Sequence, residues 1–315
     1  MSKIINLTII LFLTIILFVS CNEDELNKES IFRTDIKELD STSYTFKFDK
    51  FLMENFRIPY NIQFRYKMQD IGTDMDYDLI PATLSKAKQM AVLVKYLWFD
   101  VYSDVVGEKF LKENGIRIIH LIGSPAKNLY YGTETVGLAE AGIKISLLAV
   151  NRLNVNRIYN QPYFQTMHHE FMHVLHQKKL YPSEFNYFSS SFYTPDKWQD
   201  YASKPEKIAE AWRLGFVTGY AMKSVSEDFV ETIAKYIVTN DTDWANMLKE
   251  AEKPHDDLLP EIGADIIRKK LEVCKGYLRD SWSINLEEIR SEVLRRQSFV
   301  NETFVNSLFE EYDID

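Results

Sequence analysis

The sequence predicts an α+β fold in which a small sheet precedes a largely helical C-terminal half. Two short, largely apolar runs, at residues 116–122 and 143–150, each follow a glycine, as buried strands often do. Beyond about residue 163 almost every apolar pattern has the helical period. With 46% apolar and 26% charged residues, the 315-residue chain has a globular composition, which excludes a disordered or multi-span membrane protein.

The first 20 residues are expected to be a lipoprotein signal peptide. Residues 4–20 form an apolar run behind Lys3, followed by Cys21 and the acidic cluster Glu23–Glu25. An uncleaved anchor helix is the alternative, because the run is nearly long enough to span a bilayer. The tetrad Phe18–Cys21 resembles a bacterial lipobox, although it begins with Phe where Leu is usual. The resemblance implies lipidation of Cys21 and a chain that is anchored to the membrane without spanning it. The acidic cluster resembles a surface-export signal, with a solvated tether as the alternative.

Residues 21–80 are expected to form a tether and an N-terminal extension to a domain of residues 81–315. Within the extension, the alternating stretches Ser43–Phe48 and Tyr60–Tyr66 predict strands. The helical spacing from Pro81 to about Tyr102 predicts a long amphipathic helix. Further helices are predicted at Val225–Val238, Asp241–Ala251, Asp257–Tyr277 and Leu286–Glu311.

Charge and cysteine content exclude two classes of protein. The chain has 37 Lys and Arg against 46 Asp and Glu, a net charge of −9, and lacks a basic run, so a nucleic acid partner is not expected. Its two cysteines cannot build a disulfide framework, and Cys274 is expected to be a buried apolar residue.

A metal site is predicted at residues 169–173, which have the pattern H-E-x-x-H. Helix positions i and i+4 share one face, so the imidazoles of His169 and His173 can reach one zinc ion. Glu170 can then act as the base on a water whose pKa zinc lowers toward about 7, and carry the proton to a leaving amine. The alternative is a helix whose histidines only make hydrogen bonds in the core.

Two more histidines flank this motif. His176 lies two turns from His169, too far for both to bind one tetrahedral ion, so it is expected to support a ligand or to lie at the surface. His168 points about 100° away from His169 and is expected to be structural.

The third ligand must come from another segment, and residues 226–231 are the best candidate. Glu227 and Glu231 share a helix face, so one can bind the metal while the other orients a ligand histidine. Ser224 and Glu227 also match a capping box, which is the structural alternative. The other candidate ligands are Glu184, Glu206 and Glu210.

These two motifs together resemble a family of zinc metallopeptidase lipoproteins found beside outer-membrane nutrient importers, the substrate-import-associated zinc metallohydrolases. They are similar, more distantly, to the lethal-factor type of gluzincin. In that type the first glutamate of an E-x-F-x-E stretch binds zinc, and a tyrosine seven residues earlier faces the substrate. The resemblance implies a zincin-like fold with one Zn²⁺ per chain, held by His169, His173 and Glu227 and supported by Glu231. It also implies that Tyr220 stabilises the oxyanion, with ordinary packing as the alternative role of this tyrosine.

The leading interpretation is therefore a zinc-dependent metallopeptidase, lipid-anchored in the cell envelope at the outer membrane and associated with nutrient import. Both the cell surface and the inner face of that membrane are open as its position. Its peptide or protein substrate would pair with an edge strand, such as residues 143–150. The alternative is a non-catalytic surface lipoprotein that keeps zinc for structure and binds peptide or glycan for an outer-membrane importer. Structural zinc is closed by four protein ligands, so an open coordination position would favour catalysis.

Overall fold

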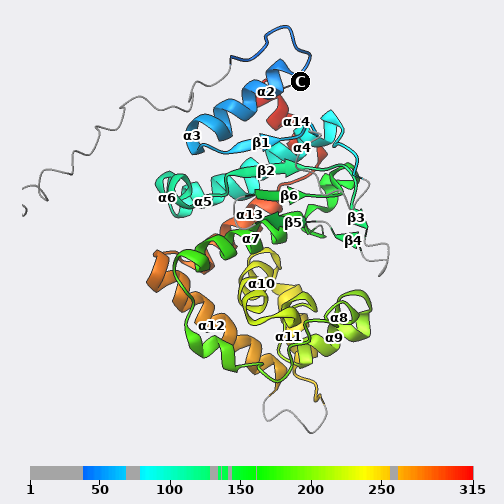
Figure 1. Cartoon of the computed structure of the whole chain (residues 1–315), viewed down its shortest axis with the longest axis vertical. Coiled ribbons are helices and arrows are strands. Elements are labelled where there is room, and N and C mark those ends of the chain that lie inside the picture. The colour runs from blue at the N-terminus through cyan, green and yellow to red at the C-terminus, as the bar shows by residue number, and fades with distance from the viewer. Residues whose placement is uncertain are drawn as a thin grey trace, which may run out of the picture. The chain divides into compact units, whose positions relative to one another are not determined.

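The computed structural model describes residues 38–68, 79–127, 134–135, 137–140, 144–160, 162–255 and 262–314. Contacts divide the chain into two units, Met1–Asp40 and Ser41–Asp315, and every described helix and strand belongs to the second (Figure 1). The expected signal peptide and Cys21 lie outside the described residues. Among the helices of the described part, none combines the length and the apolar character needed to cross a bilayer.

The α+β class is confirmed, with one small sheet and a helical C-terminal half. The sheet has the order β1-β2-β6-β5, where β1 is Gln63–Arg65, β2 is Ile118–Leu121, β6 is Lys144–Leu147 and β5 is Gly137–Glu140. Strands β1, β2 and β6 are parallel, and β5 pairs antiparallel with β6. A separate two-stranded ribbon joins β3 (Ala126–Lys127) to β4 (Glu134–Thr135).

The expectation that residues 143–150 supply an edge strand is wrong. Strand β6 lies between β2 and β5, and all four of its residues are buried. A nearly continuous apolar run indicates burial on both faces, which fits an interior strand better than an edge. Among the described strands, β5 is the edge next to β6.

The strand expected at Ser43–Phe48 is also wrong, because this segment opens a helix. Helix α2 (Phe46–Leu52) continues through a π-helical turn, η1 (Met53–Arg57), into α3 (Ile58–Tyr60). The buried side chains Phe48, Phe51, Leu52 and Phe56 have helical spacing, which a short window of alternating residues concealed. The second predicted strand, Tyr60–Tyr66, contains β1.

The long helix predicted from residue 81 is present with a π-helical turn inside it. It runs as α4 (Leu84–Val94), η2 (Lys95–Phe99) and α5 (Asp100–Val105), and α6 (Glu108–Asn114) follows. Thr83 caps its start by accepting a hydrogen bond from the backbone N–H of Lys86. After the sheet come two short 3-10 segments, η3 (Val150–Arg152) and η4 (Val155–Asn160).

The helical half begins with α7 (Tyr163–Lys178), which packs on β5 and β6 and on α10 (Val225–Val238) (Figure 1). The remaining elements are η5 (Ser183–Tyr187), α8 (Asp200–Ser203), α9 (Pro205–Arg213), η6 (Tyr220–Lys223), α11 (Asp241–Ala251), α12 (Gly263–Trp282), α13 (Leu286–Gln297) and α14 (Glu302–Glu311).

The helices predicted at 225–238 and 241–251 are confirmed at both ends. The single helix expected at 286–311 is wrong, because it breaks between α13 and α14. There the side chain of Asn301 accepts a hydrogen bond from the backbone N–H of Phe304 and so caps a new helix. The start of the helix expected at Asp257 lies outside the described residues, and α12 extends to Trp282.

Candidate metal centre

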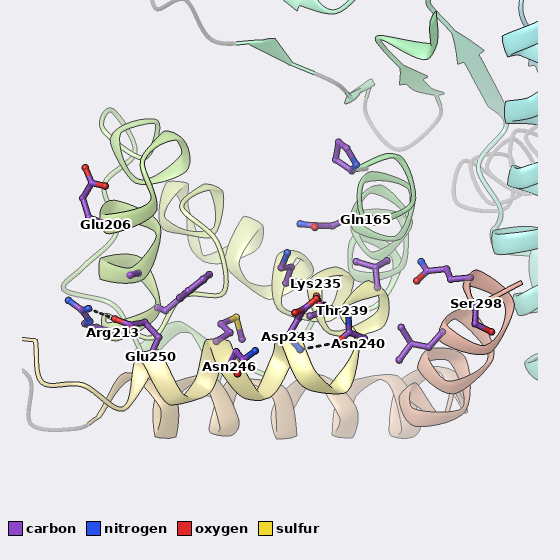
Figure 2. Close-up of a pocket in the computed structure, with 17 residues that line it drawn as sticks. Gln165, Glu206, Arg213, Lys235, Thr239, Asn240, Asp243, Asn246, Glu250 and Ser298 are labelled. Atoms are coloured by element: carbon purple, nitrogen blue, oxygen red, sulfur yellow. Dashed lines mark hydrogen bonds and ion pairs between the residues drawn. The ribbon is translucent and has the colours of Figure 1, made fainter. Parts of the chain in front are cut away.

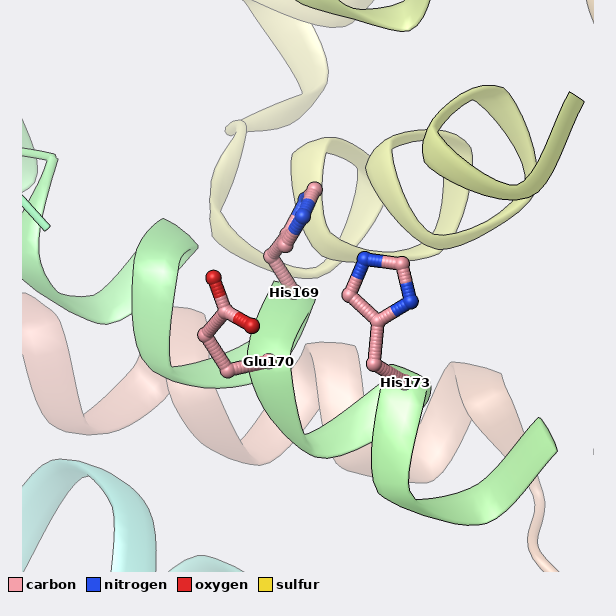
Figure 3. Close-up of side chains that lie close together, drawn as sticks. All are labelled: His169, Glu170 and His173. Atoms are coloured by element: carbon pink, nitrogen blue, oxygen red, sulfur yellow. The ribbon is translucent and has the colours of Figure 1, made fainter. Parts of the chain in front are cut away.

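Helix α7 presents both motif histidines on one side. Met167, Phe171 and Leu175 are buried in the core, so the helix is fixed by its apolar face. His169 and His173 project toward α10 with ring centroids 4.8 Å apart, and Glu170 lies beside them (Figure 3). Ligand atoms of these three residues all lie within 4.8 Å of one another.

The two imidazoles converge on a single carboxylate oxygen. Oε2 of Glu227, in the first turn of α10, lies 3.1 Å from Nε2 of His169 and 3.1 Å from Nε2 of His173. Burial alone would raise the pKa of Glu227, but hydrogen bonds from both histidines and from Lys223 hold that pKa well below its ordinary value. The capping role of this residue is also present, because its backbone N–H donates to Oγ of Ser224 at 3.3 Å. Glu227 can serve both roles, because it caps the helix through its backbone N–H and faces the histidines through its side-chain carboxylate.

Glu231, one turn later on α10, orients His169 by contacting Nδ1, the ring nitrogen that does not face Glu227. Its Oε1 lies 2.8 Å from Nδ1 of His169, and its Oε2 accepts from Thr218 Oγ1 at 2.7 Å and Gln165 Nε2 at 3.0 Å. A carboxylate only accepts, so Nδ1 of His169 carries the donated proton and Nε2 is directed at Glu227. Burial lowers the pKa of His169, but its bonds to Glu227 and Glu231 outweigh burial and raise that pKa to about 10. The surroundings of His169 therefore favour positive charge.

His176 supports the second histidine. Its Nε2 lies 2.9 Å from Nδ1 of His173. Burial, with the charge of His173 as a smaller cause, lowers the pKa of His176 to about 4, so at neutral pH it is uncharged and can accept this hydrogen bond. His173 is thereby oriented with Nε2 toward Glu227. The ring of His176 also packs edge-on against Phe229 on α10, with ring centroids 6.4 Å apart.

His168 faces the other side of α7, where it is fully buried. Its Nδ1 lies 3.0 Å from the hydroxyl of Tyr102 on α5, and burial lowers its pKa to about 3. A neutral, buried imidazole that ties α7 to α5 has a structural role.

Glu170 has a different environment from Glu227. Burial raises the pKa of Glu170 above its ordinary value, although the nearby charges of His169 and His173 oppose the shift. A carboxylate whose pKa is moved toward neutrality is suited to take up and release a proton.

Tyr220, in η6, lies at the edge of this cluster. Its hydroxyl donates to Oε1 of Glu227 at 3.2 Å, and its ring centroid is 5.6 Å from that of His169. Lys223 Nζ donates both to the Tyr220 hydroxyl at 3.0 Å and to Glu227 Oε1 at 2.9 Å. Burial and the charge of Glu227 raise the pKa of Tyr220 to about 12, so its phenol keeps its proton at neutral pH.

Asp228, next to Glu227, points into the core instead. It is fully buried and accepts from Lys270 Nζ at 2.6 Å and from Tyr193 OH at 2.8 Å. Lys270, on α12, also donates to the backbone oxygen of Gly215 at 2.8 Å. This ion pair fastens α10 to α12 directly behind the residue that faces the histidines.

Sequence reasoning did not single out Lys223, Gln165 or Thr218. Gln165 precedes His169 by four residues, so helical spacing alone could have flagged it. Among the other carboxylates considered, Glu210 pairs instead with Lys207 at 2.6 Å. Glu206 lies on α9, and Glu184 lies in η5.

The donor set fits a zinc ion. Two imidazole nitrogens and one carboxylate oxygen are the ligands of one class of catalytic zinc site. For metal–ligand distances of about 2.0–2.1 Å, the edge of a tetrahedron is about 3.3 Å, close to the two separations of 3.1 Å between Glu227 Oε2 and the histidine Nε2 atoms. The carboxylate of Glu170 also lies within 4.8 Å of the ligand atoms of both histidines. In catalytic zinc sites with three protein ligands, the fourth coordination position belongs to water or substrate.

Comparisons with known proteins agree with this chemistry. Residues 41–287 match a family described as "Putative zinc-binding metallo-peptidase". The crystal structure of a putative zinc-binding metallo-peptidase from Bacteroides caccae ATCC 43185 is 37% identical in sequence, with a TM-score of 0.66. The similarity covers 82% of this chain and 95% of that one. A search of curated proteins finds none that matches.

Proposed function

Since the chain belongs to this family of zinc metallopeptidases, we propose that His169, His173 and Glu227 hold one zinc ion and that Glu170 carries the proton during hydrolysis of a peptide bond. The convergence of both Nε2 atoms on Oε2 of Glu227, at 3.1 Å each, is the observation that carries the proposal. When bound, zinc supplies Lewis-acid chemistry: it lowers the pKa of a water toward about 7 and polarises the scissile carbonyl.

The residues of the chain divide the remaining work. The carboxylate of Glu170 accepts the proton of the attacking water and delivers it to the nitrogen of the leaving amine. Glu231 and His176 hold the two imidazoles in orientation through their Nδ1 atoms. Because the Tyr220 phenol is protonated, it can donate a hydrogen bond to the oxyanion that develops on the carbonyl oxygen.

The test separates zinc binding from hydrolysis. Glu170→Gln should retain one zinc per chain and reduce the hydrolysis of peptides by about 10²–10⁴-fold, the usual contribution of a general acid–base residue. Glu227→Gln should instead weaken zinc binding itself. Glu272→Gln, which changes a carboxylate that is 70% exposed on α12, is the matched control. Wild-type turnover by Glu170→Gln would refute the proposed role.

We further propose that the protein is a lipoprotein anchored through Cys21 in the outer membrane, exposed at the cell surface and acting beside a nutrient importer. The support is the tetrad Phe18–Cys21 and the family resemblance of the two motifs. Cys21→Ala should move the protein from the membrane fraction to the soluble fraction. Equal amounts of both forms in washed membranes would contradict lipid anchoring, and failure to co-purify with an importer in mild detergent would contradict that association.

A further inference from the structure

A groove of about 1090 Å³ lies among five helices at the N-terminal end of α7 (Figure 2). Residues of α9, α10, α11 and α13 complete its walls. The motif residues His169, Glu170 and His173 do not line it, and the mechanism above makes no use of it. Gln165 is the residue that connects the two regions, because it lines the groove and also donates to Glu231 at 3.0 Å.

The groove and the metal centre lie along the same two helices, α7 and α10, with the buried Glu231 between them. These helices run antiparallel, since His173 contacts Glu227 while Gln165, two turns earlier on α7, contacts Glu231. Lys235, one turn beyond Glu231 on α10, then lines the groove. At about 1.5 Å per residue, Glu227 and Lys235 are about 12 Å apart along the helix axis, the length of about four residues of extended peptide.

The lining has the chemistry of a peptide site. Apolar side chains, including Trp212 and Met247, contribute surface to it. Trp212 donates its indole N–H to the backbone oxygen of Val217 at 3.1 Å, so its polar atom is already satisfied. Four primary amides also line the groove: Gln165, Asn240, Asn246 and Gln297. Of these, Gln165 donates to Glu231 and Asn240 caps α11 through Asp243. A primary amide carries both donors and an acceptor and can therefore pair with a peptide group.

Charge does not dominate this surface. Its two cations, Arg213 and Lys235, face three carboxylates, and Arg213 is paired with Glu250. A ligand chosen mainly by its net charge would find no strong preference here. An apolar surface edged with amides suits an extended peptide that carries an apolar side chain.

We propose that this groove binds the substrate peptide on one side of the scissile bond, so that the enzyme acts on chains extending about four or more residues beyond the metal centre. The inference rests on the proposed function. It assigns selectivity for extended peptides to the groove, with Trp212 and Met247 contacting an apolar side chain.

A pair of neighbouring substitutions on α11 tests the groove. Asn246 and Ala245 are both exposed, but only Asn246 lines the groove. Asn246→Trp fills the space, and Ala245→Trp places the same side chain outside it. Ala209→Trp fills the groove from α9 and serves as a second blocking variant.

Binding is measured with zinc-loaded Glu170→Gln protein and fluorescein-labelled peptides of about ten residues that tile β-casein, by fluorescence anisotropy. The best binder is then trimmed from each end to about four residues. Asn246→Trp should weaken binding of the long peptide at least tenfold and leave the trimmed peptide unaffected, whereas Ala245→Trp should match the parent protein. Equal binding of the long peptide by both tryptophan variants would overturn the inference.

Turnover of the same peptides by the wild-type protein separates this inference from the proposed function. Groove-dependent binding without turnover would refute the catalytic proposal and support the groove. Turnover that is insensitive to Asn246→Trp and Ala209→Trp would support the catalytic proposal and refute the role of the groove. Absence of both binding and turnover would refute both, and competition by maltoheptaose but not by unlabelled peptide would overturn the assignment to peptides.

Discussion

Replacing Glu231 by glutamine tests how strongly the carboxylate behind His169 sets the affinity of the metal centre. Glu231 is 5% exposed and accepts hydrogen bonds from three donors, on His169, Thr218 and Gln165. An amide of the same size has only one acceptor oxygen, so its NH₂ group must face at least one of these donors. The substitution therefore removes at least one hydrogen bond to a charged group, at a cost of about 1.5–3 kcal/mol.

At about 1.4 kcal/mol per factor of ten, this cost predicts that Glu231→Gln binds zinc about 10- to 100-fold more weakly than the wild type. The same range is typical when a residue that orients a metal-binding histidine is replaced. Zinc Kd would be measured by competition with a chromophoric chelator. The control is Glu272→Gln, which removes a carboxylate that is 70% exposed on α12. If both variants bind zinc as the wild type does, Glu231 does not set the affinity, and the reasoning from its three donors is wrong.

Three further predictions concern other parts of the structure. Tyr220→Phe should lower kcat about 100-fold, the usual effect of losing an oxyanion donor, with zinc content unchanged; an unchanged kcat would leave Tyr220 with a packing role. Asp228→Asn leaves the buried ammonium of Lys270 without its counter-charge and should lower the free energy of unfolding by about 3–5 kcal/mol in urea titrations, whereas a loss below about 1 kcal/mol would contradict the ion pair. Hydrogen bonds from Arg295 and Arg296 lower the pKa of Glu292 to about 2, against an ordinary value of 4.5. Because that folded-state pKa is depressed, its stabilisation is complete above pH 4.5 and is lost as the pH falls toward 2. Glu292→Gln should therefore show a flatter dependence of unfolding free energy on pH across this window, and parallel curves for the two proteins would refute the assignment.

Helical spacing was sufficient to bring most of the candidate site together. The i, i+4 relation of His169 and His173 requires only that α7 be a helix, and the relation of Glu227 to Glu231 requires the same of α10. That Glu227 faces the histidines while Asp228 faces Lys270 could not be read from spacing alone. It depends on how α10 packs between α7 and α12, which involves contacts distant in sequence.

The errors have local causes. Over the few residues from Ser43 to Phe48, alternation and helical spacing are both compatible with the sequence, and burial of Phe51 and Phe56 decides for the helix. Strand order is not encoded in any one segment, so the interior place of β6 had no signal except its apolar run. Lys223 was missed because Ser224, with φ −165° and ψ 165°, separates it from α10, and helical spacing does not continue across such a break.

The buried contact between Asp228 and Lys270 also bears on how the sequence can diverge. Loss of either partner strands a charge inside the protein, whereas replacement of both by apolar residues of similar size is often neutral or stabilising. Positions 228 and 270 should therefore covary among relatives, with both charges kept or both lost. Position 227 should stay acidic in every relative that retains the two histidines. Two adjacent carboxylates of α10 should therefore differ in how they vary, with position 227 conserved and position 228 covarying with position 270.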